Sequence, residues 1–282
     1  MKKEEEILII PKYLSTLEAF KIINTGALEI VNKWRAGQKN VLDKVNANGV
    51  HDVVTEVDLA IEELTSKISK EFIPGVRIFG EENFRQDFSV TTEPFYIVID
   101  PIDGTKEFVK GSTDWSISIC AVENGIPVVS SVFMPDRNEV FTAIKGEGTK
   151  LNDRLLMVNG NAPSEIAVSP RQIKDENIAK RILTSAHKPI EVPALTPKIC
   201  AILRGDVSAA VYFSQKGQSA SLWDYAASVL LINEFGGKIT SLTGKKLPFI
   251  GSEVIYKEGW LATNDPIRHS ELLLCLSGAV CI

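Results

Sequence analysis

The chain has 282 residues, of which 44% are hydrophobic and 24% charged, a composition typical of a soluble globular enzyme with one large domain or two lobes. Its net charge of −5 argues against a nucleic-acid polymer as partner, because such binding normally needs a basic face. Its apolar runs are too short to span a bilayer or to form the core of a signal peptide, and its four cysteines have no metal-site spacing. We therefore expect a cytoplasmic protein with reduced thiols and no membrane contact, and the alternative for the thiols is a pairing of Cys275 with Cys281.

Two amphipathic helices are predicted near the start of the chain. Apolar residues recur at a spacing of three to four over residues 13–35, and again from Ile61 to Phe72, which is the period of a helix with one buried face. Short apolar runs at residues 77–80 and 95–100 then predict two buried strands. Glu81 and Glu82 follow the first run at once, and Asp100 ends the second.

The pattern changes to a period of two between Trp115 and Val158. Four such runs, separated by the turn-forming stretches ENG, PDRN, KGEG and LND, predict antiparallel hairpins. Beyond residue 161 we expect shorter strands and helices, including helices over 175–183 and 196–204 and a long apolar helix that ends at Gly236. This order predicts mixed sheets layered with helices, with an N-terminal α+β lobe of residues 1–160 and a C-terminal α/β lobe of residues 161–282.

Acidic residues recur where one predicted element ends and the next begins. Each of them also has a plain structural interpretation: Asp58 with Thr55 matches a capping box, Glu81 can belong to a solvated loop, and Asp224 can cap its helix. The stretch IDPIDGT is harder to explain structurally. Asp100 ends a buried strand, the following proline cannot donate to a β-ladder, and Asp103 returns toward the same side.

A cation resolves the conflict that these acids create. Each pair of carboxylates about 4 Å apart costs about 4 kcal/mol at an effective dielectric constant of about 20. Mg²⁺ takes oxygen ligands and leaves positions for water and phosphate oxygens, and the amides that open a helix after DPID suit an anion. The acids therefore predict a Mg²⁺ site for a small phosphorylated substrate.

Three motifs together resemble a known family. They are GEE at residues 80–82, DPIDGT at 100–105 and WDYAA at 223–227. In this order and spacing they resemble the inositol monophosphatase superfamily of Mg²⁺-dependent, lithium-sensitive phosphatases, over residues 15–265. The stretch TKEF after DPIDG is similar to the 3′(2′),5′-bisphosphate nucleotidase branch, the CysQ-type enzymes. The resemblance implies an α/β (α+β) fold, the layered α-β-α-β-α sandwich of the inositol monophosphatase/fructose-1,6-bisphosphatase type.

The resemblance also implies a set of metal ligands. Glu81, Asp100 and the carbonyl of Ile102 would hold one Mg²⁺. Asp100, Asp103 and Asp224 would hold a second, and Glu81 with waters a weaker third. The expected cofactor is therefore two or three Mg²⁺ ions at each site.

Catalytic and substrate-binding roles follow from the same resemblance. Thr105, oriented by Asp58, would activate a water for in-line attack on phosphorus. The amides of Gly104 and Thr105 would seat the phosphate, and Thr196 and Lys198 would contact the substrate. The protein would be a monomer or a homodimer.

The substrate-reading positions depart from the nucleotidase branch. Its Ser-Ser-Leu-Lys stretch is LTPK at residues 195–198, its Tyr-Pro-Arg is YFS at 212–214, and an expected histidine is replaced by Gln172. An arginine is thus missing, and Lys216 is a candidate to supply the charge. The leading expectation is hydrolysis of the 3′-phosphate of adenosine 3′,5′-bisphosphate. The alternative is an inositol monophosphatase or another small sugar or polyol phosphate phosphatase of the superfamily.

Two other classes of protein fit these residues less well. A haloacid-dehalogenase-type phosphatase needs one residue between its aspartates and a covalent aspartyl-phosphate, whereas Pro101 and Ile102 both intervene here. A non-enzymatic phosphate or metal sensor on the same fold would be expected to lack an acid or Thr105, and none of these is missing. Both classes are therefore disfavoured.

Overall fold

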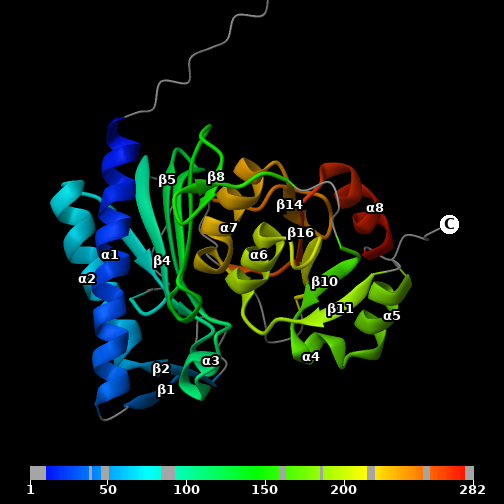
Figure 1. Cartoon of the computed structure of the whole chain (residues 1–282), viewed down its shortest axis with the longest axis horizontal. Coiled ribbons are helices and arrows are strands. Elements are labelled where there is room, and N and C mark those ends of the chain that lie inside the picture. Colours follow the sequence, from blue (N-terminus) through cyan, green and yellow to red (C-terminus); the bar gives the residue numbers. More distant parts are fainter. Residues whose placement is uncertain are drawn as a thin grey trace, which may run out of the picture.

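Helices and sheets alternate in five layers (Figure 1). The computed structural model describes residues 11–37, 40–45, 51–83, 93–158, 163–184, 187–214, 220–249 and 255–276. Two helices cover a seven-stranded sheet, two helices separate this sheet from a five-stranded one, and further helices cover the far side. This arrangement is the expected α-β-α-β-α sandwich.

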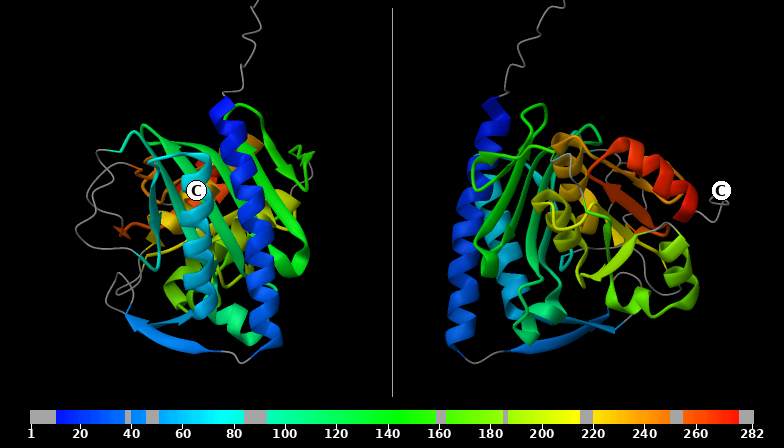
Figure 2. Two further views of the ribbon diagram at one scale, coloured as in Figure 1. Left: turned by 90° about the vertical axis from the view of Figure 1, so that its left-hand side faces the viewer. Right: turned by 45° about the vertical axis from the view of Figure 1, so that its right-hand side comes forward.

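The helices have the following bounds: α1 Pro11–Ala36, α2 Glu56–Phe72, α3 Thr105–Lys110, α4 Pro170–Ile173, α5 Glu176–Thr184, α6 Leu195–Arg204, α7 Leu222–Phe235 and α8 Pro266–Leu276, with a 3₁₀ turn η2 at Pro135–Arg137. In the part of the chain that the structure describes, each helix is too short or too polar to cross a bilayer. Helices α1 and α2 run side by side over one face of the large sheet (Figures 1 and 2). The buried residues of α1 have the spacing that the sequence predicted. In α2 the predicted apolar face is only partly buried beyond Ile61, and the polar residues Asp58 and Glu62 are buried instead.

The large sheet has the order β3-β4-β5-β6-β7-β8-β9. Its strands are β3 Arg77–Gly80, β4 Phe95–Asp103, β5 Ser116–Glu123, β6 Ile126–Met134, β7 Glu139–Ile144, β8 Thr149–Leu151 and β9 Arg154–Leu155. Strands β3 and β4 are parallel, and the other neighbours are antiparallel. The hairpins predicted from the period of two are confirmed. The strand predicted for the last run, RLLMV, is wrong beyond residue 155, because only its first two residues pair with β8.

The second sheet has the order β11-β10-β12-β16-β14. Its strands are β10 Glu165–Val168, β11 Lys188–Glu191, β12 Ala209–Tyr212, β14 Lys238–Ser241 and β16 Trp260–Thr263. Strands β11, β10 and β12 are parallel, so their carboxyl ends share one edge of the sheet. Two small ribbons complete the fold: β1 Val41–Val45 with β2 His51–Thr55, and β13 Ala220–Ser221 with β15 Ile255–Tyr256.

Helix α7 lies between the two large sheets, contacting strands β4 to β8 on one side and β14 on the other. This position explains why its sequence is apolar nearly all round. The largest cluster of buried side chains combines residues of both sheets, such as Tyr96 and Ala210. The division into lobes at residue 160 stays a prediction, because the core between the sheets is shared.

The cysteines differ from the expectation in one respect. Cys120 and Cys200 are free and buried, as predicted for reduced thiols. Cys275 is disulfide-bonded, so the prediction of a reduced thiol is wrong for this residue.

Candidate active site

The DPIDG stretch forms a bulge at the carboxyl end of β4, the second strand of the large sheet. Asp100 is paired with Ser118 of β5 and Asp103 with Ser116, so three steps along β4 match two along β5. Pro101 lies in this irregularity, where a residue without an N–H breaks no ladder bond. Bulges re-aim side chains and are common beside active sites. Here the bulge sits between the two aspartates that the sequence singled out.

Gly104 makes the turn into α3. Its φ of 94° is in the left-handed region, which glycine adopts without strain. An added Cβ would also lie 2.9 Å from the Cβ of Ala194 and 3.1 Å from the carbonyl oxygen of Asp114. The glycine of the DGT motif is therefore required both by its dihedral angle and by the close approach of the segment before α6.

Three of the predicted acids meet at one point. Carboxylate oxygens of Asp100, Asp103 and Asp224 all lie within 4.8 Å of one another. Asp100 is 1% exposed and Asp103 is 6% exposed. Because burial lowers the effective dielectric constant, the mutual repulsion of these charges is stronger than it would be at the surface.

Asp103 is held by the start of α6. The amide of Leu195 donates to its Oδ1 at 3.2 Å, and the amide of Thr196 donates to its Oδ2. Burial raises the pKa of Asp103, and the Thr196 amide and the charge of Lys198 partly offset this effect. The carboxylate is thus destabilised in its charged form unless a further cation is present.

Lys198 is the cation already built into this region. It is fully buried, and its Nζ donates to the carbonyl of Ala194 at 2.9 Å and to that of Pro193 at 3.4 Å. Burial lowers its pKa to about 8, against the opposing effect of the Asp103 and Asp224 charges. One lysine cannot neutralise three carboxylates, so the cluster retains a negative charge when all are ionised.

Asp58 makes the contacts that both of its interpretations require, and its catalytic role stays a prediction. Its Oδ2 accepts the Thr55 amide at 2.8 Å and the Thr55 hydroxyl at 2.6 Å, which completes a capping box at the start of α2. Its Oδ1 accepts the Thr105 hydroxyl at 3.4 Å. The same hydroxyl lies 3.0 Å from the carbonyl oxygen of Ile102. The Thr105 hydroxyl therefore contacts both Asp58 and the backbone of Ile102.

Asp224 likewise has a structural role and a place in the cluster. It is the third residue of α7, and its Oδ2 accepts the amide of Ser221 at 2.5 Å. The first turn of α7 lies at the carboxyl end of β4, because the Asp224 carboxylate is within 4.8 Å of those of Asp100 and Asp103. Capping and membership of the acidic cluster are compatible, because each carboxylate has two oxygens.

Glu81 lies beside the cluster rather than within it. Gly80 is paired with Ile99 in parallel register, so Glu81 and Asp100 follow the ends of neighbouring strands. Within the part of the chain that the structure describes, the carboxylates that meet within 4.8 Å are those of Asp100, Asp103 and Asp224. Glu81 as a metal ligand stays a prediction.

The positions tied to substrate recognition lie around the carboxyl ends of β10 and β12. Thr196 and Lys198 are both fully buried. Gln172 donates from Nε2 to the carbonyl of Phe213 at 2.5 Å and accepts the Phe213 amide at 3.4 Å, which joins the end of β12 to α4. Lys216 lies outside the described residues. The substrate-binding roles of Gly104, Thr105, Thr196 and Lys198 stay predictions.

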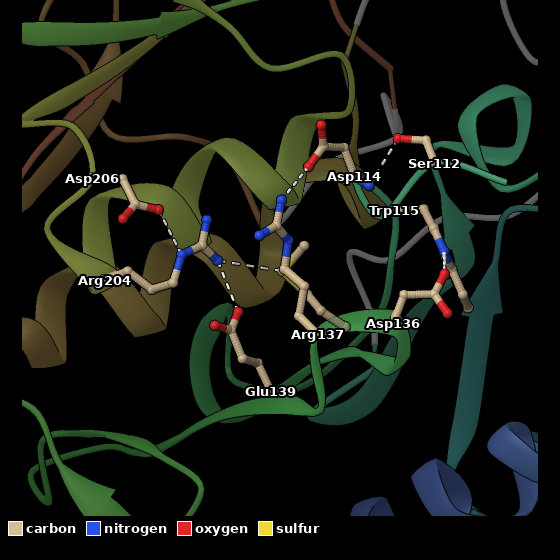
Figure 3. A network of polar contacts seen from close by, with 9 residues as sticks. Ser112, Asp114, Trp115, Asp136, Arg137, Glu139, Arg204 and Asp206 are labelled. Atoms are coloured by element: carbon tan, nitrogen blue, oxygen red, sulfur yellow. Dashed lines mark hydrogen bonds and ion pairs between the residues drawn. The ribbon is translucent and has the colours of Figure 1, made fainter. Parts of the chain in front are cut away.

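A polar network holds the far end of α6 against the large sheet (Figure 3). Arg204 donates to Glu139 at 2.8 Å and to Asp206 at 2.6 Å, and Arg137 donates to Asp114 at 2.8 Å. Sequence reasoning did not single out this network, because its members are single charged residues at scattered positions. It also missed Glu62, a buried acid of α2 that lies one helical turn after Asp58.

The residues present fit Mg²⁺. Three aspartate oxygens within 4.8 Å of one another form an all-oxygen donor set, which is the set that this hard cation prefers. Soft sulfur ligands are not part of the group, which disfavours zinc.

The comparisons with known proteins agree with this geometry. The sequence matches the inositol monophosphatase family over residues 15–277. It is 31% identical to inositol monophosphatase 2 of Solanum lycopersicum over 229 residues, which is 74% of this chain and 82% of the relative. It is 27% identical to a putative Nus factor SuhB of Neisseria meningitidis serogroup B over 256 residues, 85% of this chain and 91% of the relative.

Solved structures show the same fold. An IMPase/NADP phosphatase complexed with Mg²⁺ and phosphate has a TM-score of 0.76 and 21% identity, covering 93% of this chain and 96% of the other. The fold is therefore the layered sandwich of this class of phosphatases. The chain belongs to the inositol monophosphatase family.

Proposed function

We propose that this chain is a Mg²⁺-dependent phosphomonoester hydrolase acting on a small phosphorylated metabolite. The convergence of the Asp100, Asp103 and Asp224 carboxylates within 4.8 Å carries the proposal. Two of these side chains are buried, and buried like charges persist in a folded protein only where something offsets them. A divalent cation satisfies this requirement, and its remaining coordination positions can take water and phosphate oxygens.

Bound Mg²⁺ would supply charge neutralisation at phosphate oxygens and a lowered pKa for water. The chain's own contribution is the placement of a proton relay. The Thr105 hydroxyl lies 3.4 Å from Oδ1 of Asp58 and 3.0 Å from the carbonyl oxygen of Ile102. Thr105 Oγ1 can accept a proton from the attacking water while its own proton moves to Asp58. The amides of Gly104 and Thr105 are proposed to seat the phosphate.

Two substrate classes remain within this proposal. The sequence TKEF after DPIDG and the presence of Lys198 support the 3′-phosphate of adenosine 3′,5′-bisphosphate, whose hydrolysis gives AMP. The names of relatives support inositol monophosphate: two from Solanum lycopersicum and one from Bacillus subtilis are called inositol monophosphatases. The missing arginine at residues 212–214 and the full burial of Lys198 weaken the first class relative to the second.

A phosphate-release panel tests the proposal. The purified chain is assayed with adenosine 3′,5′-bisphosphate, inositol 1-phosphate and fructose 1,6-bisphosphate, with Mg²⁺ and after its removal by chelation. We expect Mg²⁺-dependent release, with the highest kcat/KM on one of the first two compounds. Asp103→Asn should lower kcat by on the order of 10²–10³. Release that survives both chelation and this substitution would contradict the proposal.

A further inference from the structure

Helix α2 presents two buried carboxylates on one face. Asp58 is 1% exposed and Glu62, four residues later, is 2% exposed. Residues four apart lie one above the other on a helix. Asp58 faces the DGT turn through Thr105, so Glu62 is placed one turn farther along the same face.

Glu62 binds the backbone of the GEE loop. Its Oε2 accepts the amide of Glu82 at 2.9 Å, and its Oε1 accepts the amide of Asn83 at 3.0 Å. Both oxygens of one carboxylate thus receive consecutive amides directly after Glu81. Charge-assisted hydrogen bonds of this kind are stronger than neutral ones, and two of them fix both the position and the orientation of the loop.

Gly80 allows this contact. A Cβ added at residue 80 would lie 2.2 Å from the carboxyl carbon of Glu62 and 2.4 Å from its Oε1. The carboxylate therefore occupies the space that any other side chain at residue 80 would need. The close approach of Glu62 therefore explains why residue 80 of the GEE motif is a glycine.

The arrangement carries an electrostatic cost, because burial raises the pKa of Glu62 and the charge of Glu81 acts in the same direction, opposed by the two amides. A buried carboxylate needs hydrogen bonds that offset its lost hydration, and the amides of Glu82 and Asn83 supply two. A glutamine at residue 62 would turn an N–H₂ toward one of the two amides, so only a carboxylate accepts both bonds.

We propose that Glu62 is a positioning residue for Glu81, and that α2 holds both motif loops in register, the DGT turn through Asp58 and the GEE loop through Glu62. This inference rests on the proposed function, because it gives Glu81 a role in Mg²⁺ binding. Glu62 would then act on the metal site without binding the metal, through its hydrogen bonds to the backbone of the GEE loop.

The test measures Mg²⁺ binding directly by titration calorimetry, together with the Mg²⁺ concentration for half-maximal activity. Glu62→Gln should weaken Mg²⁺ affinity by about 10-fold to 100-fold, while kcat at saturating Mg²⁺ stays within about threefold of wild type. Glu63→Gln, the same change at the neighbouring exposed residue, should leave both quantities unchanged. Equal affinities for the two variants would overturn the inference.

Two further variants show whether the effect passes through Glu81. Glu81→Gln and the double variant Glu62→Gln/Glu81→Gln should bind Mg²⁺ equally weakly, because a positioning residue adds nothing once its target is removed. Additive losses would overturn the inference.

Gly80→Ala, which displaces the Glu62 carboxylate without changing a charge, should reproduce the loss of affinity, with thermal melting as the check on folding. A wild-type chain that binds no Mg²⁺ would overturn the proposed function itself, and this inference with it.

Discussion

At the scale of single residues, the acids of this site each make more than one contact. Asp58 caps α2 with one oxygen and reaches Thr105 with the other, and Asp224 accepts an amide at the start of α7 while it belongs to the acidic cluster. The sequence predicted both the structural and the functional interpretation of these residues. It could not choose between them, because a carboxylate has enough lone pairs for both.

Thr105 offers a direct test of the proton relay. Thr105→Ala removes the hydroxyl that lies 3.4 Å from Asp58, and we expect kcat to fall by about 10²–10⁴ with little change in KM. Thr105→Ser keeps a hydroxyl on the same backbone and should retain most of the activity. Steady-state kinetics at saturating Mg²⁺ measures both. An alanine variant as active as the serine variant would exclude Thr105 from the relay.

His269 predicts a pH dependence of stability that is separate from the active site. It is fully buried, its ring contacts the hydroxyls of Thr240 at 2.8 Å and Thr263 at 3.3 Å, and burial lowers its pKa to about 4. The unfolded chain therefore binds this proton at higher pH than the folded protein, so stability is lost as pH falls from 6.5 to about 4. The loss expected from this residue is about 3 kcal/mol.

The measurement compares urea unfolding of wild type and His269→Gln across this pH window. The variant cannot titrate there, so its free energy of unfolding should fall less than that of wild type as the pH is lowered. A constant difference between the two proteins over the window would show that the ring does not titrate as described.

At the scale of elements, local patterns predicted most of the helices and the antiparallel strands. The sequence predicted the helical period of α1 and α2, the hairpins of β5 to β7 and the start of α7. Each of these features depends on residues that are close together in the sequence. The bulge in β4 and the short ribbons were not, because they depend on pairing with distant residues. Strand β4 continues through Pro101 to Asp103, where the sequence predicted an end at Asp100.

The network at the end of α6 predicts an unequal cost for two arginines. In the ion pair of Arg204 with Glu139 the two side chains are 16% and 18% exposed. In the ion pair of Arg137 with Asp114 they are 35% and 31% exposed. Arg204→Ala should lower the free energy of unfolding by about 2 kcal/mol, because charged partners lose hydrogen bonds in a partly buried place. Arg137→Ala should cost less than about 1 kcal/mol. Urea unfolding distinguishes the two, and equal losses would contradict the account of this network.

At the scale of the whole molecule, the site exists only when distant parts of the chain come together. Asp100 and Asp103 come from the large sheet, Asp224 from the central helix, and the amides on Asp103 from α6. The sequence predicted the acids because they follow apolar runs and match a family pattern. It could not give the contacts of Asp103 with α6, or those of Glu62 with the GEE loop, because no local signal encodes them.

The central claim is that folding gathers these carboxylates into a cage for a divalent cation. A crystal grown with Mn²⁺ in place of Mg²⁺ tests it most directly, because the ion can be located by its anomalous scattering. The account predicts an anomalous peak for an ion whose distance to carboxylate oxygens of Asp100, Asp103 and Asp224 is about 2.1 Å. Ordered side chains of these three residues with no peak between them, in crystals that contain the ion at millimolar concentration, would contradict it.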